Sequence, residues 1–429
     1  MFLQESNGVA NGHLTIGGAD AVELAEQYGT PLIALDEQLI RKNARMYKSA
    51  IDCFYDGRGL VLYASKAFSC KAVCKIIAEE GLGLDVVSGG ELYTAMQAGF
   101  PAERICFHGS HKSREEIKMA LDYGVGRFVI DNDLEVQNIN ELAAGRKVKC
   151  LVRITPGVDA HTHDFIMTGK IDSKFGTPIE KGAALRFIGR ILEAENIELC
   201  GLHCHIGSQI FDLEPFAHTA EVMLDFMCQV RETYGVTFGE LNLGGGFGIK
   251  YVESNDPVAY DQYMEEISRR VHRLCKERDY ALPFIYMEPG RSMVGSAGTT
   301  LYTVGAIKEI EGVRTYVTID GGMTDNPRYA LYQADYTAAV ANRMDEPADW
   351  TVTIAGRCCE SGDLIQEHTK IQRCESGDLL AVFATGAYNY SMASNYNRLP
   401  RPAVVLVKEG ESRLAIRRES YEDLVRNDL

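Results

Sequence analysis

Residues 60–98 read LVLYASKAFSCKAVCKIIAEEGLGLDVVSGGELYTAMQA, and this stretch contains the pattern that decides the fold. Two short apolar runs, 60–64 and 84–87, are each followed by a segment with apolar residues at helical spacing, 69–80 and 88–98. Short apolar strands that alternate with amphipathic helices are typical of parallel strands joined by crossover helices. The stretch therefore predicts two consecutive strand–helix units.

The same unit recurs as far as residue 287. Six further strands are predicted at 105–107, 127–130, 149–154, 198–203, 239–243 and 283–287. The later helices are predicted at 113–122, 133–143, 178–195, 214–234 and 256–277. Eight parallel strands with intervening helices predict an α/β fold with a (β/α)8 barrel of the TIM type, which usually takes about 250 residues. We expect this barrel to occupy residues 36–287.

After Pro289 the sequence changes to strand-like runs with little helical periodicity, such as RTYVTI at 314–319 and PAVVLVKEG at 402–410. These runs predict a C-terminal β-rich domain, a β-barrel or sandwich, over residues 288–429. Residues 1–35 end in the extended-looking PLIAL, and we expect them to join the β-rich domain.

The composition excludes several classes of protein. Hydrophobic residues make up 46% and charged residues 24% of the chain, and no apolar run is long enough to span a bilayer. A net charge of −16 without a Lys/Arg cluster argues against nucleic-acid binding. The first residues lack the pattern of a secretory signal, so we expect a cytoplasmic protein whose 12 scattered cysteines stay reduced.

Polar residues follow the predicted strands, at the end of the barrel where enzymes of this fold have their active sites. Lys66 follows the first strand and is a candidate for Schiff-base formation, because burial would free its amine to attack a carbonyl. Gly244, Gly245 and Gly246 follow the seventh strand, where backbone N–H groups of such barrels bind phosphate. A solvated lysine and an ordinary glycine-rich turn are the alternatives.

Glu288 and Arg291 follow the last strand. A carboxylate in this position can keep a pyridine nitrogen protonated, and an arginine can balance a phosphate or a substrate carboxylate. A solvated pair of loop charges is the alternative.

The motif CGLHCHIG at 200–207 looks like a metal cluster at first. Strand alternation, however, places Cys200 and Cys204 on one face and His203 and His205 on the other, so the four side chains do not converge easily. Two interpretations stay open. His203 and His205 can share a metal ion, as in barrel hydrolases, or one imidazole can stack on a flat cofactor ring.

The predicted β-rich domain contains two further candidate elements. AGRCCESGD at 355–363 places two cysteines and two acids on one loop, an arrangement that suits acid–base chemistry better than a strained disulfide between adjacent cysteines. Arg328 and Tyr332 are four residues apart and can hold a carboxylate together from one helical face. The alternative is that both side chains lie on the surface and have no role in binding.

At this point the chain resembles a known family, the diaminopimelate decarboxylases, which are relatives of the eukaryotic ornithine decarboxylases. The resemblance covers nearly the whole chain and rests on YASKA, GLDVVSGGEL, FHGSHKS, RITPGVDAHTH, TGKIDSKFG, GLHCHIGSQI, LNLGGGFG, MEPGRSMVG, DGGMTDNPRYALY, CCESGD and GAYNYSMASNYN. The sequence departs from the family in having Arg357 where proline is usual and Tyr329 where proline commonly follows the substrate arginine.

The resemblance implies pyridoxal 5′-phosphate as cofactor, no metal ion, and decarboxylation of meso-diaminopimelate to lysine. It implies that Lys66 carries the cofactor covalently, His205 stacks on its ring, and Ser208 lies close to it. The other implied cofactor contacts are Gly244, Gly245, Gly246, Glu288, Arg291 and Tyr388. The implied substrate contacts are Arg291, Arg328, Tyr332, Glu360 and Tyr388, with Cys359 as proton donor.

The resemblance also implies a homodimer in which Cys359 and Glu360 reach the active site of the neighbouring subunit, and a loop over Asp159–Gly176 that covers the site. Three rival functions remain: a decarboxylase for carboxynorspermidine, ornithine, lysine or arginine; a metal-dependent barrel hydrolase; and a catalytically silent homologue. Arg328 and the CCES loop count against the first, and Lys66 together with Cys359 against the last.

Overall fold

The computed structural model describes residues 2–158 and 173–429, which form two compact units. Unit 1 comprises Met1–Lys42, Ile249–Asp256 and Arg291–Leu429, and unit 2 comprises Asn43–Gly248 and Pro257–Gly290. Most of the segment Asp159–Gly176, for which the resemblance implies a covering loop, lies outside the described residues.

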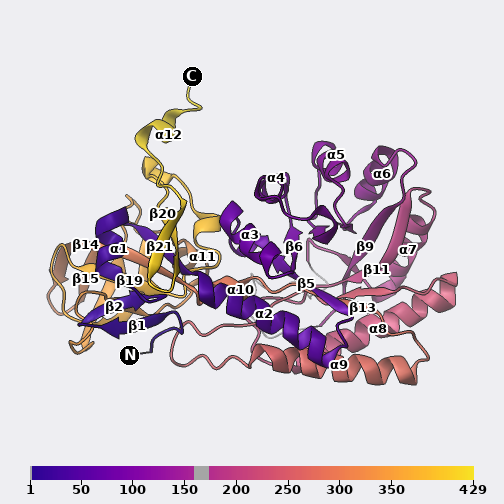
Figure 1. Cartoon of the computed structure of the whole chain (residues 1–429), viewed down its shortest axis with the longest axis horizontal. Coiled ribbons are helices and arrows are strands. Elements are labelled where there is room, and N and C mark those ends of the chain that lie inside the picture. Colours follow the sequence, from indigo (N-terminus) through magenta and orange to yellow (C-terminus); the bar gives the residue numbers. More distant parts are fainter. Residues whose placement is uncertain (1, 159–172) are drawn as a thin grey trace. The chain divides into compact units, whose positions relative to one another are not determined.

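Unit 2 is a closed barrel of eight parallel strands, as the sequence predicts (Figure 1). Its strands are β5 (Gly59–Ala64), β6 (Gly83–Val86), β7 (Ile105–Phe107), β8 (Arg127–Ile130), β9 (Val148–Thr155), β11 (Ile197–His203), β12 (Glu240–Asn242) and β13 (Phe284–Met287). Each strand pairs with the next, and β13 pairs with β5 to close the ring, while the short β10 (Thr177–Pro178) extends β9.

One helix, α2 (Glu37–Phe54), precedes the first barrel strand, and the helices that follow the strands occur in the predicted order. The latter are α3 (Lys71–Glu79), α4 (Gly89–Ala98), α5 (Arg114–Tyr123), α6 (Asp133–Leu142), α7 (Ala183–Leu192), α8 (Glu214–Tyr234) and α9 (Tyr260–Glu277). Local sequence fixes several of their ends: Ser88 accepts a hydrogen bond from Glu91 N at the start of α4, and Ser113 forms a capping box with Glu116 at the start of α5. Gly99 ends α4 in the left-handed conformation that glycine adopts without strain.

The barrel interior contains a packed cluster of buried side chains from five strands, namely Leu62, Cys106, Val129, Leu151 and Tyr286. Arg127 at the start of β8 makes a two-pronged ion pair with Glu240 at the start of β12, at 2.7 and 2.6 Å. These contacts close the amino-terminal end of the barrel, so the opposite end is left for the polar residues that follow the strands.

Unit 1 is built around a sheet with the strand order β18-β17-β15-β14-β4-β20-β21, and β19 pairs with both β14 and β16. The strands are β4 (Leu32–Asp36), β14 (Gly298–Ile310), β15 (Arg314–Ile319), β16 (Ala338–Val340), β17 (Trp350–Ala355), β18 (Leu364–Ile371), β19 (Leu379–Phe383), β20 (Ala403–Lys408) and β21 (Glu411–Ile416). Unit 1 also contains a small sheet of three strands, β1 (Asn7–Ala10), β2 (His13–Ile16) and β3 (Ala19–Asp20). Its helices are α1 (Ala21–Tyr28), α10 (Arg291–Val294), α11 (Arg328–Tyr332) and α12 (Tyr421–Val425). The PLIAL segment, expected to join the β-rich domain, pairs with strands of that domain, because β4 lies between β14 and β20.

The division into units differs from the ranges expected from the sequence, 36–287 for the barrel and 1–35 with 288–429 for the β-rich domain. The first division falls inside α2, and Ile249–Asp256, which lies within the expected barrel range, groups with unit 1. The physical reason is local packing: Tyr251 O accepts a hydrogen bond from Thr337 Oγ1 (3.0 Å), and Lys250 O accepts one from Gln4 Nε2 (2.8 Å).

All twelve cysteines are free thiols, as expected for a chain without a disulfide framework. Over the described parts of the chain, none of the helices combines the length and the apolar character needed to cross a membrane.

Candidate active site

Lys66 follows β5 in a short 3₁₀ turn, Ser65–Ala67. Its neighbours Ser65 and Ala67 are buried, but the lysine side chain is exposed, so the burial expected from the sequence is not supplied by the chain itself. The turn is anchored by Ser65 Oγ, which donates to Glu91 Oε2 (2.9 Å), and the same carboxylate oxygen accepts from Val87 N (2.8 Å). The ends of β5 and β6 are thereby tied together beneath Lys66.

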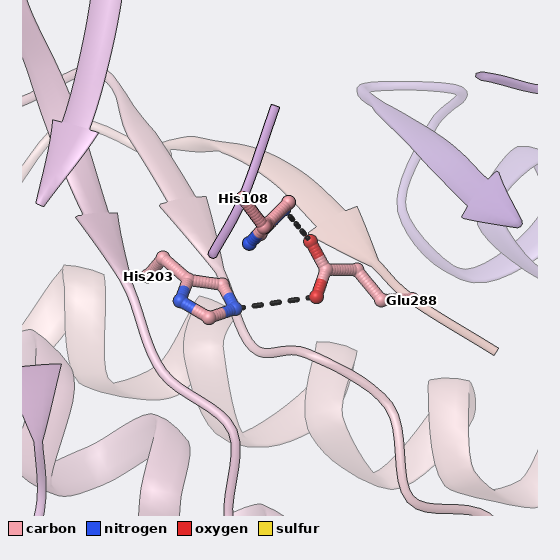
Figure 2. A group of neighbouring side chains, drawn as sticks. All are labelled: His108, His203 and Glu288. Atoms are coloured by element: carbon pink, nitrogen blue, oxygen red, sulfur yellow. Dashed lines mark hydrogen bonds and ion pairs between the residues drawn. The ribbon is translucent and has the colours of Figure 1, made fainter. Parts of the chain in front are cut away.

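The carboxylate of Glu288, directly after β13, is held by three polar side chains: Asn242 of β12, His203 of β11 and His108, which directly follows β7. Figure 2 shows Glu288 with the two histidines. Asn242 Nδ2 donates to Oε1 (2.6 Å). His203 Nε2 donates to Oε2 (3.2 Å). His108 Nε2 lies 2.8 Å from Oε1. Glu288, His108 and His203 are all buried, so this group is preorganised inside the barrel end.

The charges in this group are set by burial and by the pairing itself. Burial alone would raise the pKa of Glu288, but the two histidines outweigh it and hold that pKa well below its usual range. Burial lowers the pKa of His203 to about 3, against the opposing pull of Glu288. Glu288 is therefore an anion and His203 a neutral hydrogen-bond donor at neutral pH.

Asn242 connects Glu288 to the glycine loop, because its Oδ1 accepts from Gly244 N (2.9 Å) while its Nδ2 donates to the carboxylate. A Cβ at Gly245 would lie 2.0 Å from the carbonyl oxygen of Glu288, so only glycine fits there. Gly246 has a φ of +119° and its N–H has no acceptor among the described residues. Of the three N–H groups expected to bind phosphate, the first two already have partners in the protein, and Gly246 supplies the available donor.

His205 lies in the loop after β11 and accepts a hydrogen bond from Gly245 N at its Nδ1 atom (3.3 Å). Burial, followed by the positive charges of Lys66 and Arg153, lowers the pKa of His205 well below its usual value, so the ring is neutral. Ser208, further along this loop, is half-buried. Among groups of three or more potential metal ligands in the described residues, the one whose ligand atoms lie within 4.8 Å of one another is His108, His203 and Glu288, and His205 is not part of it.

Unit 1 contains a cluster of two arginines and three tyrosines, here called the arginine–tyrosine cluster. Its members are Tyr251, Arg291, Arg328 and Tyr336, which are buried, and Tyr388, which is half-buried. Arg291 Nη1 donates to Tyr251 Oη (2.6 Å), and Arg328 Nη1 donates to Tyr336 Oη (2.9 Å). The guanidinium carbon of Arg291 also lies 4.8 Å from the ring centroid of Tyr388, a residue with φ of +61°. Arg328 has no carboxylate partner among the described residues, so its charge is stabilised only by tyrosines.

The structure separates the roles of the tyrosines around α11. Tyr332 is half-buried, and Arg328 donates a hydrogen bond to the hydroxyl of Tyr336. Tyr329, which departs from the family pattern, donates its hydroxyl to Glu367 Oε2 on β18 (2.6 Å). Tyr329 therefore anchors α11 to the sheet.

The loop Cys358–Asp363 is organised by the buried carboxylate of Asp363. Its two oxygens accept from Cys358 N (2.7 Å) and Met323 N (2.6 Å). Cys359 and Glu360 are exposed, and Cys359 N donates to Asn397 Oδ1 (2.7 Å). Burial and the adjacent Asp363 raise the pKa of the Cys358 thiol to about 12. Cys358 is therefore a protonated anchoring residue, and Cys359 is the accessible thiol.

Sequence reasoning assigned no role to His108, Asn242, Tyr251 or Tyr336, and it included Asp363 only as one of two acids in a loop suited to acid–base chemistry. Two of these carried a usable signal, because a histidine directly after the third strand and an asparagine inside the apolar run LNL are polar residues at the active end of a barrel. Tyr251 and Tyr336 carried no such signal in the sequence, since folding alone brings them into contact with the arginines.

Comparison with known proteins identifies the family. Residues 37–295, more than half of the chain, match the model of the pyridoxal-dependent decarboxylases, pyridoxal binding domain. The chain is 54% identical to a diaminopimelate decarboxylase of Bacillus subtilis, over 100% of this chain and 98% of the relative. It is 50% identical to a diaminopimelate decarboxylase of Halalkalibacterium halodurans, with the same coverage of 100% and 98%.

The fold agrees with the sequence comparison. The crystal structure of diaminopimelate decarboxylase from M. jannaschii in complex with L-lysine superimposes with a TM-score of 0.93, at 36% identity, and covers 100% of this chain and 99% of that one. A buried anion at the end of the last barrel strand and glycines after the seventh are features that a pyridoxal-binding barrel needs. The chain therefore belongs to the pyridoxal-dependent decarboxylases and, within them, to the diaminopimelate decarboxylase family.

Proposed function

We propose that this enzyme uses pyridoxal 5′-phosphate to decarboxylate meso-2,6-diaminopimelate at its D centre, giving L-lysine and carbon dioxide in the last step of lysine biosynthesis through diaminopimelate. The family supports the reaction. The observation that carries the substrate assignment is Arg328, a buried guanidinium whose only described partners are tyrosines. Such a cation suits a substrate that brings its own second carboxylate.

The residues of unit 2 fit the cofactor. Glu288 is a buried anion whose two oxygens are oriented by Asn242, His108 and His203, which suits a protonated ring nitrogen. Neutral His205 suits stacking on a flat ring, and Ser208 lies on the same loop. The available N–H of Gly246, with Gly244 and Gly245 shaping the loop, suits the phosphate, and exposed Lys66 is open for covalent attachment.

When bound, pyridoxal phosphate supplies an electron-withdrawing ring that takes up the electron pair left behind by the departing carboxylate. The chain's residues supply the rest. Glu288 stays ionised because its pKa is well below the usual range, so it can hold a proton on the ring nitrogen throughout neutral pH. Lys66, exposed directly after β5, would hold the cofactor covalently until a substrate amine replaced it, and its free amine would then be available to accept or donate a proton.

In this proposal, residues of unit 1 recognise the carboxylate and the ammonium group of the substrate's distal end. Arg291 and Arg328, with Tyr332 and Tyr388, bind the distal carboxylate, and Glu360 binds the distal ammonium group. Buried polar partners discriminate strongly, because a substrate that lacks the matching group leaves them unpaired. This arrangement accounts for selection of one end of a nearly symmetric substrate.

Cys359 is the proposed proton donor, supported by its exposure and by the anchoring of its loop through Asp363. By the family resemblance, Cys359 and Glu360 act in the site of a second copy of the chain, so we propose a homodimer. We also propose that the enzyme works in the cytoplasm.

The test compares substrates with and without the distal carboxylate. Purified holoenzyme is assayed for carbon dioxide release from meso-diaminopimelate, L-ornithine and L-lysine, alongside Arg328→Gln. We expect turnover of meso-diaminopimelate only, with kcat/KM lowered about 10²–10³-fold in the variant. Arg417→Gln, which breaks an exposed pair with Asp423 in the same unit, is the matched control and should leave kcat/KM unchanged. Equal turnover of ornithine would overturn the assignment.

A further inference from the structure

Tyr251 is a buried residue that contacts both arginines of the arginine–tyrosine cluster. It is 5% exposed, and its hydroxyl accepts from Arg291 Nη1 (2.6 Å). The guanidinium carbons of Arg291 and Arg328 lie 5.8 and 5.1 Å from the centroid of its ring. A single side chain thus faces both cations, combining a hydrogen bond with cation–π contacts.

The position of Tyr251 is fixed from several sides. Its backbone N–H donates to Asn255 Oδ1 (3.0 Å) and its carbonyl accepts from Thr337 Oγ1 (3.0 Å). Its ring packs edge-on against Tyr336 with the centroids 5.3 Å apart. Because Tyr336 binds Arg328, the two tyrosines and the two arginines form one connected group.

Holding two guanidinium groups near one another without water is costly unless anionic or strongly accepting groups face them. The titratable and charged groups that face Tyr251 are Arg291 on α10, Arg328 on α11 and Tyr336 before β16. Burial would raise the pKa of the Tyr251 hydroxyl, but the two arginines outweigh it and lower that pKa below its usual value.

We propose that Tyr251 is a positioning residue of this cluster: its neutral hydroxyl and ring hold Arg291 and Arg328 ready for one substrate carboxylate, and its phenolate, formed at alkaline pH, competes with that carboxylate. The proposal rests on the proposed function, since it concerns the distal carboxylate of the same substrate. When the hydroxyl of Tyr251 loses its proton, the phenolate replaces the ligand carboxylate as the anion that neutralises the arginines.

The sign of the pH effect follows from the charges. Below the pKa of Tyr251 its hydroxyl is neutral, the cluster carries both positive charges, and a carboxylate binds tightly. Above that pKa the phenolate neutralises one charge, so carboxylate affinity falls. Tyr251→Phe removes both effects, because phenylalanine keeps the ring but can neither accept from Arg291 nor ionise.

The experiment measures the dissociation constant of L-lysine, which retains the distal carboxylate, and of cadaverine, which has the same carbon chain without it. Titration calorimetry on the holoenzyme is run at steps from pH 7 to pH 10 for wild type and Tyr251→Phe. The ratio of the variant and wild-type constants cancels the ionisation of the ligand itself. At pH 7 we expect the dissociation constant of L-lysine to be about ten times larger for the variant than for wild type, because the variant lacks one hydrogen bond to a charged group.

We expect this ratio to fall steadily as pH rises, whereas the cadaverine ratio stays near one. Tyr336→Phe is the matched variant: it removes the hydroxyl bound to Arg328 but leaves Tyr251 in place, so its lysine ratio should stay constant over the same pH range. A lysine ratio for Tyr251→Phe that does not change with pH, or an equal effect on cadaverine, overturns the role of Tyr251.

Failure of this inference is distinguishable from failure of the proposed function. If wild-type enzyme turns over meso-diaminopimelate and binds L-lysine, but the ratio for Tyr251→Phe stays flat, only the role of Tyr251 is wrong. If wild-type enzyme binds neither ligand through a carboxylate, both the cluster's assignment and the inference are wrong.

Discussion

Glu288 shows how a single residue acquires a chemical role from its neighbours. Its carboxylate accepts from Asn242 and His203 and touches His108, and these contacts keep it ionised although it is buried. We predict that Glu288→Gln lowers kcat about 10²–10³-fold, because a neutral amide cannot hold a proton on a ring nitrogen. Steady-state turnover of meso-diaminopimelate measures this, and the absorption spectrum of the bound cofactor reports the lost protonation independently.

The control for that prediction lies at the opposite end of the same barrel. Glu240→Gln makes the identical change in the ion pair with Arg127. It should lower thermal stability while kcat stays within about twofold of wild type, since this carboxylate is remote from the strand ends where catalysis occurs. Equal kcat losses in both variants would show that Glu288 acts only through the fold.

The two adjacent cysteines lead to a second prediction at this scale. Cys358 has a pKa raised to about 12, so at pH 8 only about one thiol in 10⁴ is ionised. In a Cys53→Ser background, which removes another exposed thiol, iodoacetamide should label Cys359 and spare Cys358. We expect Cys359→Ser to lower kcat about 10²-fold and Cys358→Ser to change it less than about threefold. Peptide mass spectrometry and turnover check both statements, and preferential labelling of Cys358 would contradict them.

Residue types at strand ends could be predicted from the sequence, but their partners could not. Lys66, His205 and Glu288 stand at positions where a barrel presents side chains to substrate, so each was a candidate before the structure. The contacts of Asn242 with Glu288 and of Tyr251 with Arg291 join residues 46 and 40 positions apart. No periodic pattern encodes such distant pairs.

At the scale of elements, the β7–α5 connection is held by a buried ion pair. Lys112 Nζ donates to Glu135 Oε2 on α6 (3.1 Å) and to the carbonyl oxygens of Gly109 (2.8 Å) and Val129 (2.7 Å). We predict that Lys112→Met lowers the free energy of unfolding by about 3–5 kcal/mol, because Glu135 is left charged and unpaired in the interior. Thermal and urea unfolding monitored by circular dichroism measure the loss.

Lys118→Met is the matched control for the Lys112 variant. Lys118 pairs with Asp122 on the exposed face of α5, and both side chains are more than half exposed. Removing such a pair should change stability by less than about 1 kcal/mol. If the two variants were equally stable, the buried pair would contribute no more than a surface one.

The elements that the sequence predicted and those it missed differ in length and in how regular their apolar pattern is. The barrel strands and their helices agree with prediction within a few residues, because fully apolar strands and amphipathic helices carry strong patterns. β16, β18 and β21 were missed, since β18 and β21 mix polar and apolar residues at the two edges of the sheet and β16 is only three residues long. The predicted helix at 178–195 is shorter, Ala183–Leu192, because Lys181 and Gly182 adopt positive φ before it.

At the scale of the whole molecule, the proposed homodimer predicts complementation between inactive variants. Lys66→Ala and Cys359→Ser each remove a group proposed to act in the same site but to come from different subunits. After mixing under conditions that exchange subunits, half of the dimers are mixed and contain one intact site, so about a quarter of the wild-type activity should return. Activity equal to the sum of the separate variants would show that both residues serve the site from one chain.

Formation of L-lysine from meso-diaminopimelate with pyridoxal phosphate can be measured by following carbon dioxide and lysine from the meso and LL isomers. We predict that lysine and carbon dioxide appear in equal amounts from the meso isomer, that the LL isomer gives none, and that Lys66→Ala gives none from either. Release of carbon dioxide from the LL isomer, or no release from the meso isomer by enzyme loaded with the cofactor, would contradict the account.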